Sequence, residues 1–185
     1  MSTNEVITYQ QDTLDKAAKV RLLALDVDGV LTDGKLYFAN NGEELKSFST
    51  LDGQGIKLLQ ANGVDVALIT ARQSALVARR AADLGIRHLV QNCGNKLAAL
   101  NALLTQLELE PDQAAYVGDD LPDLACIQHV GLGISVPNGH FSARVQASLV
   151  TRSPGGDGAV REVCDLILLA QDKLYAAIAA WLEEA

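Results

Sequence analysis

The sequence predicts an α/β fold in which a mainly parallel sheet lies between two layers of helices. Short apolar runs alternate with segments of helical spacing along most of the chain, and polar residues suited to chemistry follow three of these runs. Repeated strand–helix–strand succession favours parallel strands, whose ligands bind at the carboxyl ends near a switch point in strand order. We therefore expect a three-layer domain with its site at that edge of the sheet.

The predicted strands are the apolar runs at residues 20–25, 64–69, 86–90, 114–117, 130–134 and 148–151. Apolar residues at helical spacing predict helices at 55–61, 73–84, 96–107 and 122–127. A glycine-rich segment at 152–158, expected to be flexible, precedes an amphipathic helix with Val160, Val163, Leu166 and Ile167 on one face, and the helical pattern resumes at 173–182.

Residues 34–49 interrupt this alternation and predict a β-hairpin inserted after the first strand. Asn41 and Gly42 form a strong hairpin-turn signal between two short arms. The aromatic side chains of Tyr37, Phe38 and Phe48 either pack on the parent domain or form a contact between subunits. No room remains for a cap domain, so we expect one domain over residues 1–185, with a glycine-rich tail and helical segment at 152–185.

The composition excludes several classes of partner. A formal net charge of −8 argues against binding to nucleic acid or to an anionic membrane, since both require a basic face. No apolar stretch approaches the roughly 18 residues that cross a bilayer, and no signal-peptide profile is present, so we expect a cytoplasmic protein. Cys93, Cys126 and Cys164 lack disulfide or zinc spacing and are expected to be reduced packing residues.

Two carboxylates one residue apart follow the first predicted strand, in the octet Asp26-Val27-Asp28-Gly29-Val30-Leu31-Thr32-Asp33. A strand pleat would direct Asp26 and Asp28 to the same side, and two like charges so close require a compensating cation. A divalent metal ion would supply it. The alternative is an ordinary strand end and turn, because Asp and Gly are common turn residues.

The residue types in this octet suit phosphoryl transfer. Asp26 is the candidate nucleophile, since a carboxylate can attack phosphorus and form an aspartyl-phosphate. Asp28 is the candidate general acid and base, which would protonate the leaving alkoxide and then deprotonate the water that cleaves the intermediate.

A second acidic cluster, Gly118-Asp119-Asp120-Leu121-Pro122-Asp123, follows the fourth predicted strand. Mg²⁺ prefers octahedral oxygen ligands, with one or two carboxylates, waters and substrate phosphate. Asp26, the main-chain carbonyl of Asp28 and Asp119 would meet that requirement, while Asp120 and Asp123 would orient the ligands from outside. A helix cap at Pro122 accounts for one of these aspartates but not for three.

Thr70 and Lys96 complete the set of candidate catalytic residues. Thr70 follows the second strand and can donate a hydrogen bond to a phosphoryl oxygen; Lys96 can offset the charge of nucleophile and phosphate. The order of the octet, Thr70, Lys96 and Asp119 resembles the four motifs of the haloacid dehalogenase (HAD) superfamily. That resemblance implies a Rossmann-like α/β/α core.

Further features restrict the resemblance to one family within the superfamily. They are the hairpin, the missing cap and three segments: Asp52-Gly53-Gln54-Gly55-Ile56-Lys57-Leu58-Leu59, Ile69-Thr70-Ala71-Arg72, and Gly155-Gly156-Asp157-Gly158-Ala159-Val160-Arg161-Glu162. These resemble the capless 3-deoxy-D-manno-octulosonate 8-phosphate phosphatases of lipopolysaccharide biosynthesis. The family implies a Mg²⁺-dependent homotetramer in which hairpins associate centrally and each active site lies at a subunit boundary. It also implies that the glycine-rich tail can cover a neighbour's active site.

Carried over by position, the family's substrate contacts fall on Asp28, Ser49, Thr50, Leu51, Asp52, Gly53, Lys57, Arg72, Arg80 and Lys96. The cations among them suit a phosphorylated sugar acid with two anionic ends. Helical phase leaves Arg79 open as an alternative to Arg80.

Three other functions are weighed against this one. A phosphatase for a nonulosonate 9-phosphate of the sialic acid type would share every motif. A catalytically inactive oligomeric binding module would be expected to lack Asp26, Asp28 or Asp119, and all three are present. A phosphomutase would generally need a cap to exclude water, which the chain lacks.

Overall fold

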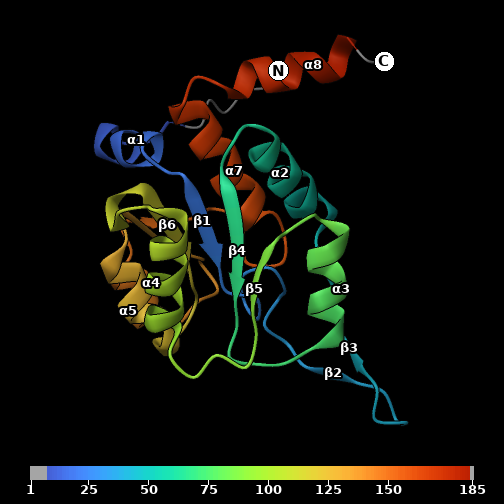
Figure 1. The fold of residues 1–185 in the computed structure, drawn as a ribbon. Helices are drawn as coiled ribbons and strands as arrows, with labels where there is room; N and C mark the ends of the chain where they lie inside the picture. Colours follow the sequence, from blue (N-terminus) through green and yellow to red (C-terminus); the bar gives the residue numbers. More distant parts are fainter. Residues whose placement is uncertain (1–7, 184–185) are drawn as a thin grey trace.

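The central sheet has six strands in the order β5-β4-β1-β6-β7-β8, in a computed structural model that describes residues 8–183. All of its pairings are parallel, which confirms the predicted fold class (Figure 1). The strands are β1 (Leu22–Leu25), β4 (Asp65–Ile69), β5 (His88–Val90), β6 (Ala114–Val117), β7 (Leu132–Ser135) and β8 (Leu149–Val150).

Helices cover both faces of this sheet. The helices α1 (Gln11–Ala18), α2 (Thr50–Ala61), α3 (Ala75–Asp83) and α7 (Ala159–Ala170) share one apolar core with Leu23 and Leu25 of β1. The helices α4 (Lys96–Leu107), α5 (Leu124–His129) and α6 (Phe141–Gln146) pack on the opposite face, against Leu22 and Ala24. The chain also forms two short 3₁₀ turns, η1 (Pro111–Gln113) and η2 (Leu121–Asp123), and α8 (Leu174–Glu183).

Two helices, α1 and α6, lie outside the segments expected to be helical, and α2 begins at Thr50 rather than at residue 55. Glycines weaken a helical signal, and α2 contains Gly53 and Gly55. Tertiary packing explains why α2 has glycine at both positions. A Cβ on Gly53 would collide with the guanidinium of Arg80, and one on Gly55 would lie 2.9 Å from the side chain of Arg161.

The predicted hairpin is present as β2 (Tyr37–Phe38) and β3 (Glu44–Leu45), which pair antiparallel. It projects from the domain at the carboxyl end of the sheet, whereas α8 lies at the opposite end (Figure 1). Of its aromatic residues, Phe48 packs against the core, as one of the two expectations has it, whereas Tyr37 and Phe38 are exposed.

The glycine-rich segment is not a free tail in this chain. The Gly156 N–H donates to the carbonyl of Val30 at 2.8 Å, and the Gly155 N–H donates to Asn138 Oδ1 at 2.8 Å. A Cβ on Gly155 would collide with the carbonyl of Gly29. The glycines therefore permit close packing of this segment against the loop that follows β1.

The remaining expectations concern cysteines and membrane helices. All three cysteines are free; Cys126 and Cys164 are buried and Cys93 is half-buried, as expected of packing residues. Within residues 8–183, no helix combines the length and apolar character needed to span a membrane.

Strand β1 is the switch point of the sheet. It pairs with β4 on one side and β6 on the other, with Leu25 in register with both Leu68 and Val117. Because all three strands end at the same edge, Asp26, Thr70 and Asp119 are brought to one place, as the strand-end rule predicts.

Candidate active site

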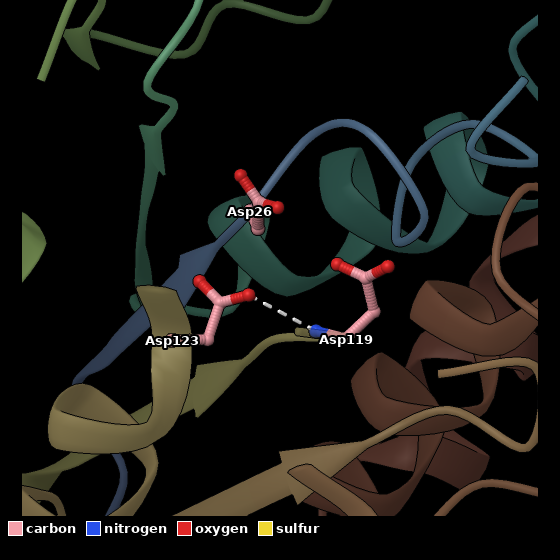
Figure 2. A group of neighbouring side chains, drawn as sticks. All are labelled: Asp26, Asp119 and Asp123. Atoms are coloured by element: carbon pink, nitrogen blue, oxygen red, sulfur yellow. Dashed lines mark hydrogen bonds between the residues drawn. The ribbon is translucent and has the colours of Figure 1, made fainter. Parts of the chain in front are cut away.

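A pocket of about 250 Å³ opens at this edge of the sheet. It is lined by the expected catalytic and metal-binding side chains, Asp26, Asp28, Thr70, Lys96, Asp119, Asp120 and Asp123, together with Arg72 and neighbouring small residues. Figure 2 shows Asp26, Asp119 and Asp123 gathered at the ends of their elements.

Asp26 is buried and held next to a cation. Its N–H donates to the carbonyl of Val117 at 3.0 Å, which continues the parallel pairing of β1 with β6 by one residue. Its Oδ1 lies 2.8 Å from Lys96 Nζ. Burial and the charge of Asp123 raise the pKa of Asp26 to about 6, and the Lys96 ammonium opposes that rise. The carboxylate is therefore costly to ionise unless further positive charge is present.

Lys96 is the first residue of α4, where the Asn95 side chain caps the helix by accepting from the Ala98 N–H at 3.0 Å. Its Nζ contacts both Asp26 and Asp123, the latter at 2.7 Å. Burial alone would lower the pKa of Lys96, but the two carboxylates outweigh burial and raise it. The side chain is thus a fixed cation inside the pocket.

Asp123 is fully buried, and hydrogen-bond donors within the protein occupy both of its oxygens. Oδ1 accepts from Lys96 Nζ at 2.7 Å and from the Tyr116 hydroxyl at 2.7 Å. Oδ2 accepts from the N–H group of Asp119 at 3.1 Å (Figure 2) and from that of Asp120 at 3.2 Å. Asp123 therefore orients the loop that carries Asp119, consistent with a position outside the set of direct metal ligands.

Among the described residues, Asp26, Asp119 and Asp123 offer oxygens within 4.8 Å of one another, a grouping that can hold a metal ion. Since Asp123 is already satisfied by the protein, the carboxylates left to bind a cation are those of Asp26 and Asp119. Burial, Asp26 and Asp123 raise the pKa of Asp119 to about 7. A divalent cation between the two carboxylates would offset their repulsion and favour their ionised forms.

Gly29 brings the backbone of the first motif up to Asp119. Its φ of +98° favours glycine, and a Cβ there would collide with Asp119 Oδ2. The Asp28–Gly29 peptide consequently lies beside the Asp119 carboxylate. Thr32, to which the sequence analysis assigned no role, stabilises this loop, because its Oγ1 accepts from the N–H groups of Gly29 and Gly34, each at 3.3 Å.

Thr70 is buried directly after β4, and its N–H donates to the carbonyl of Val90 at 2.9 Å. Its Oγ1 accepts from the Arg72 N–H at 3.3 Å, which leaves the hydroxyl hydrogen for a ligand in the pocket.

Asp28 contacts the hairpin residue Lys46, and Lys46 and Arg72 both contact Glu44; sequence reasoning missed both hairpin residues. Asp28 Oδ1 bonds with Lys46 Nζ, while Glu44 accepts from Arg72 Nη2 at 2.8 Å. A usable signal existed: Glu44, Lys46 and Phe48 alternate along one arm, so all three point to the side that faces the domain.

The expected substrate contacts divide into two groups. Asp28, Arg72 and Lys96 line the pocket, whereas Lys57 is exposed and Arg80 donates to the Ser49 carbonyl at 3.0 Å, outside the pocket lining. The other residues outside the lining are Ser49, Thr50, Leu51, Asp52 and Gly53.

Two of these residues have structural partners instead. Ser49 caps α2, and the buried Asp52 accepts from the Arg161 N–H at 2.8 Å, at the start of α7. Of the two adjacent arginines, Arg80 packs over the ring of Phe48, while Arg79 is exposed.

Comparison with known proteins gives consistent matches. Residues 86–163 match the haloacid dehalogenase-like hydrolase family. The chain is 51% identical to the 3-deoxy-D-manno-octulosonate 8-phosphate phosphatase KdsC of Yersinia pestis over 166 residues, 90% of this chain and 89% of that protein.

Solved structures agree with this. The fold matches a 3-deoxy-D-manno-octulosonate 8-phosphate phosphatase from Moraxella catarrhalis, solved with magnesium ion, phosphate ion and KDO, with a TM-score of 0.91 and 45% identity, covering 94% of this chain and 99% of that one. A cobalt-bound phosphatase from Haemophilus influenzae matches with a TM-score of 0.84 and 36% identity, covering 89% and 99%.

Proposed function

The chain belongs to the family of 3-deoxy-D-manno-octulosonate 8-phosphate phosphatases within the HAD-like hydrolases, and on this premise we propose that it hydrolyses 3-deoxy-D-manno-octulosonate 8-phosphate to the free sugar acid and phosphate, with Mg²⁺. The observation that carries the proposal is the convergence of Asp26, Asp119 and Lys96 in one pocket that Asp28 and Arg72 also line.

Asp26 acts as the nucleophile. One of its carboxylate oxygens attacks phosphorus, the bond from phosphorus to the sugar oxygen breaks, and Asp28 gives its proton to the leaving alkoxide. Asp28, now ionised, accepts a proton from the water that attacks the aspartyl-phosphate, which releases phosphate and restores the Asp26 carboxylate. The position of both side chains in the pocket supports this division of roles.

The other pocket residues stabilise charge. Lys96 offsets the negative charge of Asp26 and the transferring phosphoryl group, and Thr70 donates its free hydroxyl hydrogen to a phosphoryl oxygen. Asp26, Asp119 and the main-chain carbonyl of Asp28 would hold Mg²⁺, which when bound neutralises charge on the phosphoryl oxygens.

Asp120 and Asp123 support the metal site from outside. Asp120 accepts from the Leu121 N–H at 2.8 Å and caps η2, and Asp123 orients Asp119 through its N–H. Their hydrogen bonds favour an orienting role over direct metal binding.

The sugar end of the substrate is bound by cations. Arg72 lines the pocket and suits the substrate carboxylate. Thr50, Leu51 and Lys57 are exposed and lie outside the lining of this chain's own pocket, so we assign them to the site of a neighbouring subunit in a homotetramer. Exposed apolar residues on the hairpin, Leu36, Phe38 and Leu45, support a contact between subunits there. The whole chain would act as one cytoplasmic domain in lipopolysaccharide biosynthesis.

Phosphate release from two sugar phosphates tests the proposal. The full chain with Mg²⁺ should hydrolyse 3-deoxy-D-manno-octulosonate 8-phosphate faster than a nonulosonate 9-phosphate, and chelation with EDTA should abolish both activities. The variant Asp26→Asn should be inactive. Equal rates on the two substrates would overturn the substrate assignment, and an active Asp26→Asn would overturn the nucleophile.

A further inference from the structure

The hairpin contributes a buried cation to the active site. Lys46 follows β3, and its side chain is only 2% exposed although the hairpin itself projects from the domain. Its Nζ bonds with Asp28 Oδ1 and lies 3.6 Å from Glu44 Oε1. A lysine is rarely this buried unless a specific partner holds it, so its position requires a reason.

The geometry of the arm explains how Lys46 reaches Asp28. Glu44, Lys46 and Phe48 lie on the inward face, and Phe48 packs against the domain core and under Arg80. At the other end, Arg72 Nη2 donates to Glu44 at 2.8 Å. The arm is therefore attached on both sides of Lys46, which leaves its ammonium little freedom to move.

Asp28 has two cationic neighbours, and they differ in kind. Lys46 donates a direct hydrogen bond to Oδ1, whereas Arg72 Nε lies 3.8 Å from Oδ2, beyond hydrogen-bond distance. Lys46 thus engages Oδ1 and leaves Oδ2 on the side of Arg72, a residue that lines the pocket. A general acid must present its proton to the leaving oxygen at hydrogen-bond distance, so this orientation bears directly on catalysis.

We propose that Lys46 is a positioning residue for phosphoryl transfer: by holding one oxygen of Asp28, it directs the other toward the leaving oxygen of the substrate. The inference rests on the proposed function, since it takes Asp28 to be the general acid. It gives the hairpin a part in the chemistry of its own chain, separate from any role between subunits.

If Lys46 had a purely structural role, a different result would be expected. If Lys46 only attaches the hairpin, its loss should slow all substrates by a similar factor. If it orients Asp28, the loss should depend on whether the leaving group needs a proton. The sugar alkoxide needs one, while 4-nitrophenolate is stable as the anion and does not.

The experiment measures first-turnover release of the leaving group, which reports attack by Asp26 separately from the later water step. Wild type is compared with Lys46→Met, Lys46→Gln and Lys46→Arg, on 3-deoxy-D-manno-octulosonate 8-phosphate and on 4-nitrophenyl phosphate. The matched control is Lys35→Met on the same hairpin, where the side chain is 72% exposed and pairs only loosely with Asp33. Melting curves establish that each variant folds.

We expect Lys46→Met to slow sugar release about 10- to 100-fold and nitrophenolate release less than about threefold, part of the 10²- to 10⁴-fold that general acids contribute. Lys46→Arg should recover part of the loss, and Lys35→Met should match wild type. Equal slowing of both substrates, or no slowing, would overturn the inference, and Lys46→Gln provides the same test if Lys46→Met does not fold. A fully active Asp28→Asn would instead refute the proposed function.

Discussion

Lys96 Nζ lies 2.8 Å from Asp26 Oδ1, so the candidate nucleophile is paired with a buried cation that Asp123 also contacts, at 2.7 Å. Two carboxylates sharing one ammonium leave a net negative charge inside the protein. The negative charge is neutralised only when a further cation or a proton is bound. The stability of the protein, its dependence on pH and its affinity for a metal ion are therefore coupled at this site.

Replacing Lys96 with Met should lower the free energy of unfolding and abolish activity. The substitution leaves two buried carboxylates without their cation, which costs about 3–5 kcal/mol when one partner of a buried pair is removed. Denaturant unfolding measures the loss. The control Lys19→Met removes an exposed pair with Asp112 at 3.3 Å and should change stability by less than about 1 kcal/mol. Equal effects of the two variants would contradict the pairing argument.

Binding of Mg²⁺ should strengthen as pH rises from about 5.5 to 8. In the metal-free protein the pKa of Asp119 is about 7, above the unfolded value of 3.8, because burial and neighbouring carboxylates oppose ionisation. This group's contribution to stability is therefore fully present below pH 3.8 and lost as pH rises through 7. Since Mg²⁺ must displace the proton, the rise in melting temperature on adding Mg²⁺ should be larger at pH 8 than at pH 5.5. A pH-independent shift would contradict this.

The variant Asp123→Asn should weaken Mg²⁺ binding without removing a metal ligand. Its oxygens accept from four donors, and an amide would turn an N–H group toward one pair of them. Loss of such an orienting partner typically weakens metal binding about 10- to 100-fold. Calorimetric titration with Mg²⁺ measures this. Asp120→Asn, at an exposed residue, should have a smaller effect, and a larger effect of Asp120→Asn would contradict the orienting role of Asp123.

Gly29→Ala should impair both folding and metal binding, whereas Gly42→Ala should affect only stability. Both positions have positive φ, +98° and +86°, so both substitutions cost about 1–2 kcal/mol in backbone strain. Only at Gly29 would the new Cβ collide with Asp119, because Gly42 has nothing within 4 Å. Mg²⁺ titration of the two variants separates strain from displacement of the carboxylate; similar affinities would contradict the close approach.

Much of the fold was predictable because its signals are local. The helix α4 and the strand β6 have the predicted bounds, since periodicity and short apolar runs are properties of neighbouring residues. The helices α1 and α6 were missed, and the glycines of α2 hid its first turn because they serve contacts with Arg80 and Arg161. Long-range packing overrode local propensity there.

The class of chemistry was predictable from the sequence, because carboxylates that follow parallel strands meet at one edge of the sheet. The separate roles of these groups depend on tertiary contacts. Asp123 accepts from four donors while Asp26 and Asp119 remain available, Asp52 faces α7, and Lys46 contacts Asp28, 18 positions away along the chain. The contacts of Asp123 with Lys96, of Asp52 with Arg161 and of Lys46 with Asp28 join segments far apart in the sequence, so the spacing of residues within one element does not reveal them.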